Sequence, residues 1–194
     1  MMALVRMRPA AVVLLLAVAL FSTGCQKQRA NLNQKKLADL VNTLQGHEAD
    51  KYRPDQFESL KQQLQQVQQQ YQGQQFEAAF EQSRTALDQA EALLEEVKRE
   101  RAADLQNRGA ADIQVAQDNQ GPQLDPERFQ TILELQEKGR TEFSDNDWDG
   151  AIGAFVRASE EVERLLAALK QKAMSRLAAI EGQVKEMEAE QARE

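Results

Sequence analysis

The sequence predicts an all-α protein made of two antiparallel helical hairpins with long second helices, preceded by a signal helix and a short helix. The first observation behind this prediction is an internal repeat at a constant offset of 72 residues. The matched pairs are Pro54 and Pro126, Phe57 and Phe129, Tyr71 and Phe143, Phe76 and Trp148, Ala79 and Ala151, Ala86 and Ala158, and Leu94 and Leu166. The second observation is an aromatic content of 5% beside abundant Gln, Glu, Ala and Leu, which favours long, thin helices over a thick globular core.

Residues 1–24 have the pattern of a secretory signal. Arg6 and Arg8 supply the positive start, and an apolar run follows from Ala10 to Phe21. That run is shorter than the roughly 20 residues that a membrane-spanning helix needs. The small residues Ser22-Thr23-Gly24 then lead to Cys25, the sole cysteine of the chain. We expect export across a membrane.

This segment resembles bacterial lipoprotein signals, in which the cysteine after the small residues is lipidated and becomes the first residue. Gly24 fits that pattern, whereas Ser22 stands where an aliphatic residue is usual. The resemblance implies that Cys25 carries fatty acyl chains such as palmitate, and Gln26 in place of Asp implies the outer membrane, facing the periplasm. More than one acyl chain holds firmly, since each buried CH₂ contributes about 0.8 kcal/mol. The alternative is an ordinary cleaved signal with Cys25 an unused thiol.

The rest of the chain divides into four segments. Residues 25–35 are expected to form the lipid anchor and a hydrophilic tether. The first hairpin region covers residues 36–108, and it includes a short helix that ends near Gly46. Gly and Pro together with Asp-Asn-Gln mark residues 109–124 as a linker. The second hairpin, with a long C-terminal helix, covers residues 125–194.

Each hairpin carries an apolar stripe with steps of three or four residues, which places the stripe on one face of a helix. Pro54 and Pro126 suit the first turn of a helix, and Asp125 suits the N-cap. Gly73 and the acidic run Asp145-Asn146-Asp147 mark the two turns. The predicted core residues of the hairpins are Phe57, Tyr71, Phe76, Phe80, Phe129, Phe143, Trp148, Ile152 and Phe155.

The second turn resembles that of a tetratricopeptide repeat. The residues that carry the resemblance are Gly139, Trp148, Ala151, Ile152, Phe155 and Ala158, whereas Glu142 stands where that family usually has an aromatic residue. Residues 50–170 also look like a loosely defined group of bacterial envelope lipoproteins of unknown function, built from Ala-rich helices. These resemblances imply a helical binding or scaffolding module and supply no catalytic residue.

The last helix is predicted to be longer than its partner. No proline or strong turn signal follows Trp148, so an unbroken helix to the C-terminus would be about 70 Å long. Its apolar stripe continues through Leu177, Ile180, Val184 and Met187, which are the candidate partner-binding residues. Such a stripe must pack on another helix. The candidates are residues 93–105 of the same chain, another envelope protein, or a second copy.

Composition argues against several classes of function. The segment before Cys25 holds two of the 24 Lys and Arg residues and none of the 31 acidic residues, which leaves a net charge of −9 on the remainder. An acidic chain without a basic stripe is not expected to bind nucleic acid. With one cysteine and one histidine, His47, we expect no metal site and no cofactor.

No catalytic residue is expected either. The acidic residues Asp145, Asp147 and Asp149 lie in a polar turn, where capping explains them, and their spacing fails the EF-hand pattern. The sequence therefore favours a lipid-anchored, periplasm-facing helical adaptor or scaffold that binds a protein partner by helix packing. The alternative is a structural spacer or a self-assembling stalk of the envelope.

Overall fold

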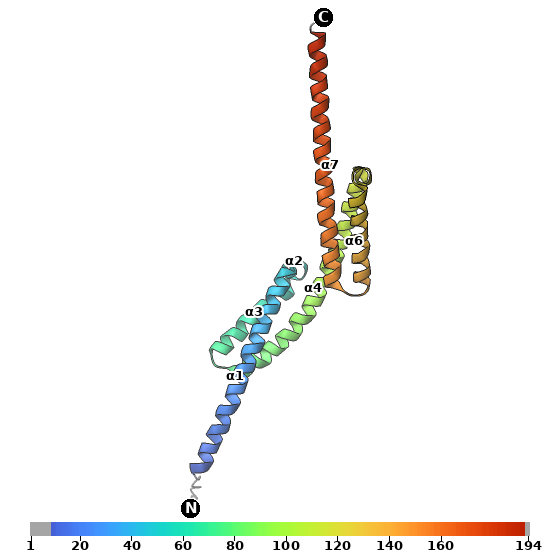
Figure 1. The fold of residues 1–194 in the computed structure, drawn as a ribbon. Coiled ribbons are helices and arrows are strands. Elements are labelled where there is room, and N and C mark those ends of the chain that lie inside the picture. The colour runs from blue at the N-terminus through green and yellow to red at the C-terminus, as the bar shows by residue number, and fades with distance from the viewer. Residues whose placement is uncertain (1–8, 193–194) are drawn as a thin grey trace, which may run out of the picture. The chain divides into compact units, whose positions relative to one another are not determined.

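A computed structural model describes the backbone of residues 9–192 and the side chains of residues 26–192. The described chain is helical, which confirms the predicted all-α class, and no strand occurs in residues 9–192 (Figure 1). The helices are α1 (Pro9–Gly46), α2 (Ala49–Tyr52), α3 (Pro54–Gln72), α4 (Phe76–Asp118), α5 (Gly121–Leu124), α6 (Pro126–Ser144) and α7 (Trp148–Gln191). The chain forms two compact units, Met1–Val97 and Lys98–Glu194, and α4 contributes to both.

In the first unit, α1, α3 and the first part of α4 pack around one apolar core. The largest buried side chains there come from all three helices and include Leu37, Leu44, Phe57 and Val67. Small buried residues of α4 face this core, among them Ala86 and Ala90. Small side chains let helix axes approach closely, so α4 can pack on both α1 and α3.

The second unit repeats this plan with the last part of α4, α6 and the first part of α7. One cluster joins Ile113 of α4, Phe129 and Ile132 of α6, and Leu165 of α7. A second cluster lies nearer the turn between α6 and α7. It consists of Ala102, Ala151, Ile152 and Phe155, with Leu105, Phe143 and Val156 packed against it. Three helices therefore bury one another in each unit.

The helix ends also repeat at the offset of 72 residues. The turns contain residues in the left-handed backbone conformation, with φ between 61° and 64°. These residues form two matched pairs, Glu48 with Gln120 and Gln74 with Asn146. Pro54 and Pro126 each begin a helix, as predicted from their fixed φ. The repeat thus covers backbone conformation as well as the apolar stripe.

Side-chain caps appear in the second unit. The Asp125 carboxylate accepts a hydrogen bond from the backbone N–H of Arg128 at 3.0 Å, at the start of α6. The Asp147 carboxylate accepts one from Gly150 N–H at 3.0 Å, at the start of α7. Each bond satisfies an amide that the helix itself leaves without a partner.

The prediction of a tether over residues 25–35 is wrong, because α1 runs without a break from Pro9 to Gly46. Ala30 is fully buried, and the Lys27 ammonium lies 5.7 Å from the centre of the Phe76 ring. Packing on the first unit therefore stabilises a helix that the polar composition alone did not predict. The Cys25 side chain and residues 1–8 lie outside what the structure describes, so the lipidation prediction has no structural counterpart here.

The predicted linker over residues 109–124 is also mostly helical. Helix α4 continues to Asp118, and α5 begins at Gly121. Ile113 and Ala116 are buried against α6 and α7, and this packing stabilises the helix beyond Gly109. Gly109 does not end the helix. It allows Gln136 of α6 to lie close to α4, since a Cβ at position 109 would come within 2.8 Å of Gln136 Oε1.

Candidate interaction surface

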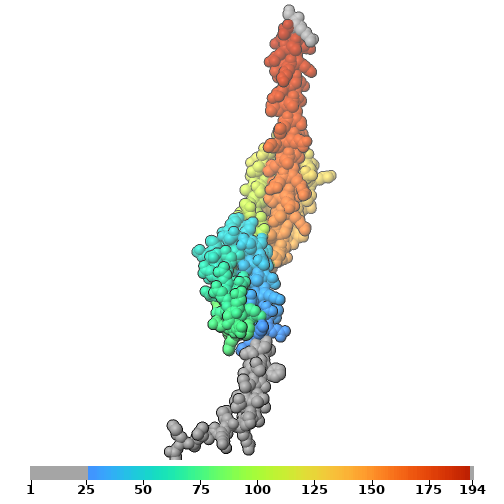
Figure 2. Space-filling view, turned by 90° about the vertical axis from the view of Figure 1, so that its left-hand side faces the viewer, coloured from blue at the N-terminus to red at the C-terminus, as the bar shows by residue number. Residues whose placement is uncertain are grey.

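The outer stretch of α7, residues 170–192, has no helix packed against it within the described chain. Every residue in this range is exposed, whereas Leu166 and Leu169 just before it still pack against the core of the second unit. Figure 2 shows this stretch in red, with nothing covering it on the side in view. Residues 170–192 therefore form a long continuous stretch of the second unit that is available for contact with another molecule.

Four candidate partner-binding residues lie on this outer stretch and are exposed. Their exposed fractions are 58% for Leu177, 56% for Ile180, 42% for Val184 and 59% for Met187. Met174 belongs with them at 63% exposed, although the sequence prediction did not include it. We call Ala173, Leu177, Ile180, Val184 and Met187 the seam, because their steps of four and three residues place them on one line along the helix.

Residues 93–105 of α4, the internal candidate for covering the seam, do not do so. Leu105 packs instead on Ala151 and Ile152, near the start of α7. Leu93 lies in the core of the first unit. The reason is geometric: α4 and α7 of the second unit run side by side only along the first part of α7, up to about Leu169.

The predicted core residues fall into two groups. Phe57, Phe129, Ile152 and Phe155 are buried, whereas Tyr71, Phe76, Phe80, Phe143 and Trp148 are half-buried. Four of the half-buried aromatic residues close the two turns as matched pairs. Tyr71 meets Phe76 edge-on with ring centres 5.3 Å apart, and Phe143 meets Trp148 in the same way at 5.1 Å.

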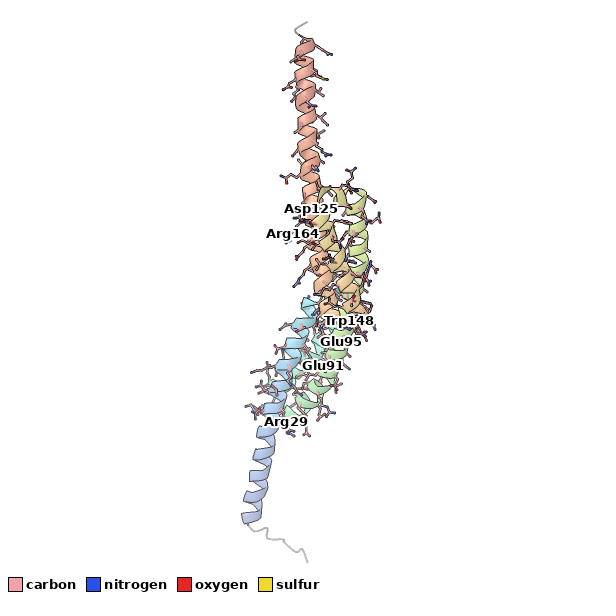
Figure 3. The ribbon with its side chains drawn as sticks, turned by 45° about the vertical axis from the view of Figure 1, so that its right-hand side comes forward. Arg29, Glu91, Glu95, Asp125, Trp148 and Arg164 are labelled. Atoms are coloured by element: carbon pink, nitrogen blue, oxygen red, sulfur yellow. The ribbon has the colours of Figure 1, made fainter. Side chains whose placement is uncertain are left out.

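Trp148 is the first residue of α7, at the turn between α6 and α7. Its ring contacts Phe143 at the end of the α6–α7 pair opposite to Asp125 (Figure 3). The acidic residues beside it have structural partners: Asp147 caps α7, and Asp149 pairs with Lys98 of α4, with 2.6 Å between Nζ and Oδ2. The turn thus holds packing and capping contacts.

Two polar side chains, Gln136 and Ser83, are buried, and the sequence did not predict the burial of Gln136. Gln136 lies in the interior of the second unit, and its Nε2 donates to the Gln106 carbonyl of α4 at 3.2 Å. Ser83 is buried in the first unit and donates to the Phe80 carbonyl at 2.8 Å. Leu133, by contrast, is apolar and is 37% exposed. The buried side of α6 therefore includes Gln136 and leaves out Leu133, which the spacing of apolar residues alone could not predict.

The shifted pKa of Glu58 belongs to an ion pair on the surface of α3. The pKa of Glu58 lies below its ordinary value because Lys61, 2.6 Å away, donates to it and attracts the charged form. Both side chains of this pair are exposed and one helical turn apart, which is typical of a surface ion pair. No group of three or more His, Cys, Asp and Glu residues that could hold a metal ion occurs in the same part of the chain.

An open groove lies at the base of the seam, where α5 meets α7. Its volume is about 590 Å³, and its floor includes Leu124, Leu166 and Leu169. Lys170, Lys172 and Arg176 line its rim. Ala173 of the seam also lines this groove, so the two surfaces adjoin.

Comparisons with known proteins add no identity. No protein-family model, curated protein or solved structure matches this chain. Among the described residues, no helix has the length and apolar character needed to cross a bilayer. The functional argument therefore depends on the residues and geometry of the chain itself.

Proposed function

We propose that this protein is a lipid-anchored, periplasm-facing helical adaptor, without enzymatic activity, that holds a protein partner by helix packing on the outer stretch of α7. The single observation that carries the proposal is the uncovered seam. Its four large side chains and the neighbouring Met174 are each at least 42% exposed, on the stretch of α7 that no other helix of the second unit covers. Contiguous exposed apolar surface on a soluble domain marks an interaction site.

The anchor in this proposal is supported by the sequence alone. The Arg-led apolar run, the small residues before Cys25 and the absence of any other cysteine match a lipoprotein signal. Gln26 supports the outer membrane as the destination, through the resemblance to lipoproteins described above. No cofactor and no metal is needed for this function.

We infer in addition that the two turns belong to the tetratricopeptide-like type. Gly139 supports this inference, because a Cβ at this position would overlap the Phe155 ring, so α6 and α7 come close at a small residue. Ala151 and Ala158 supply further small buried residues on α7. Each unit then provides a rigid base, and the outer stretch of α7 provides the docking surface.

Two experiments test the proposal. The first compares wild type with Cys25→Ala in fractionated cells: we expect wild type to need detergent for release from membranes and the variant to be released without it. If both chains stay in the membrane fraction equally, the anchor is wrong.

The second experiment places a photo-cross-linking amino acid at Leu177 in the full chain in cells. The matched control places it at Ser175, which lies on the opposite side of the same exposed helix. A docking seam gives a defined adduct from position 177 and much less from position 175. Equal labelling from both positions, or none from either, would contradict the proposal.

The alternative is a structural spacer or self-assembling stalk, and the regular spacing of the seam favours it specifically. Steps of four and three residues from Ala173 to Met187 are those of a coiled coil. A stalk predicts that the chain associates with itself through residues 170–191. The identity of the adduct from position 177 separates the two functions.

A further inference from the structure

The spacing of the seam defines how wide its partner surface can be. Leu177 and Val184 take the a positions of a heptad, and Ala173, Ile180 and Met187 take the d positions. Spacing that averages 3.5 residues keeps a narrow line facing a single helix. The first part of α7 is different, since it buries a wide face against two helices through Ala151, Ile152, Ala154, Phe155, Ala158, Val162 and Leu165.

The internal repeat decides whether the seam could instead receive a helical hairpin. At the offset of 72 residues, the outer stretch of α7 corresponds to the last part of α4, which does receive the pair α6 and α7. The residues that α4 buries there are Ala102, Gly109, Ile113 and Ala116. Their counterparts in α7 are Met174, Glu181, Lys185 and Glu188. Three of the four buried positions are thus charged in α7, so a hairpin like α6–α7 does not fit.

Charges beside the seam favour a second copy of the same helix in parallel orientation. Arg176 takes a g position and Glu181 the e position five residues later. In a parallel, in-register pair, Arg176 of each copy lies against Glu181 of the other, which forms two attractive contacts. An antiparallel pair with full overlap of the seam places Glu181 against its own copy. Complementary charge therefore selects the parallel arrangement.

The other flanking positions agree with this arrangement. Leu169 and Met174 take the preceding g and e positions, so a parallel pair extends the apolar contact towards the groove at the base of the seam. Lys170 takes an a position, and a lysine at a single a position favours a defined register and two strands. Leu177 at an a position followed by Ile180 at a d position also suits coiled coils of three or four strands. The mass of the assembly is therefore part of the test.

We propose that the outer stretch of α7 pairs with the same stretch of a second copy of this chain as a parallel, in-register, two-stranded coiled coil. The inference rests on the proposed docking role of this stretch, and it gives the self-assembling alternative a defined partner and geometry. The paired region covers about three heptads, or about 33 Å of helix. So short a coil associates weakly in solution, and anchoring both copies in one membrane raises their effective concentration.

Sedimentation of the full chain in detergent tests the pairing. We expect a concentration-dependent mass of two chains, with association about tenfold weaker in Arg176→Glu and in Glu181→Arg, because each variant places like charges together. An equimolar mixture of the two variants restores pairing, since every Arg then meets a Glu. Raising the salt concentration reduces these differences. All the changed side chains are exposed, so the helix content measured by circular dichroism stays the same.

A cysteine placed at Val184 tests the orientation. In the proposed pair, Val184→Cys lies opposite its own copy and cross-links on oxidation, whereas Gln171→Cys, on the outer face, does not. Equal cross-linking of both variants, a mass of three or four chains, or a chain that stays monomeric would each overturn the inference. If the chain is monomeric while position 177 still captures a different protein, the inference fails and the adaptor function stands. If position 177 captures nothing, both fail.

Discussion

Replacing Gly139 with valine is expected to destabilise the second unit in the native background and to stabilise it once Phe155 is shortened to alanine. A Cβ at position 139 would overlap the Phe155 ring, which is 1% exposed and therefore has little room to move. The matching positions of the first unit hold the reverse combination, Val67 and Ser83, both buried. A large residue on one helix thus accompanies a small one on the other in each unit.

The magnitudes follow from packing. Overpacking a core costs about 1–3 kcal/mol, and leaving glycine recovers only a few tenths of a kcal/mol of helix propensity, so Gly139→Val alone should cost about 1–2 kcal/mol. Phe155→Ala alone should cost about 3–5 kcal/mol. In that background the valine enters vacated space and should recover about 1–2 kcal/mol through burial. The interaction energy between the two changes is then about 2–4 kcal/mol.

Urea unfolding followed by tryptophan fluorescence measures these effects in the second unit. Trp148 is the sole tryptophan of the chain and lies against Phe143 at the turn between α6 and α7. Gly153→Val is the matched control, because this glycine lies on the exposed side of α7 and a Cβ there would meet nothing within 4 Å. The control should have the same small effect in both backgrounds. Gly139→Val with equal effects in both backgrounds would refute the packing argument.

Two further predictions concern the turns. Asp147→Ala should lower the stability of the second unit by about 1 kcal/mol, because it removes the acceptor of the Gly150 N–H bond, whereas Asp145→Ala should change it by less than about 0.5 kcal/mol. The midpoint of urea unfolding, read from Trp148 fluorescence, checks both, and equal losses would contradict the capping role. Gln74→Gly should raise the stability of the first unit by about 0.5–1 kcal/mol, because Gln74 has φ of 61° and glycine adopts this conformation without strain. Thermal unfolding followed by circular dichroism measures this, with Gln72→Gly at the end of α3 as the destabilising control; a loss of stability in Gln74→Gly would contradict the reasoning.

Sequence alone determined where most helices begin and how their faces are arranged. Pro54 and Pro126 at helix starts and the cap at Asp147 act within one turn of helix, so short-range spacing reveals them. The seam could also be predicted, because Leu177, Ile180, Val184 and Met187 recur on one face with no matching stripe nearby. These residues are exposed because α7 runs on beyond its partner helix, and the absence of proline and turn signals after Trp148 predicted this long helix.

Only the tertiary structure decided which helices share a core. Residues 26–35 and 109–118 have weak local signals, and they are helical because Ala30 packs into the first unit and Ile113 into the second. The tertiary structure also buries the polar Gln136 and exposes the apolar Leu133. The reason is that the side of α6 that faces α4 carries Gln136, which donates to the Gln106 carbonyl of α4. Helix propensity and capping act between residues up to four positions apart, whereas burial depends on residues that lie dozens of positions away in the chain. Local patterns therefore predict the helices, and long-range packing decides how far each helix extends and which of its sides is buried.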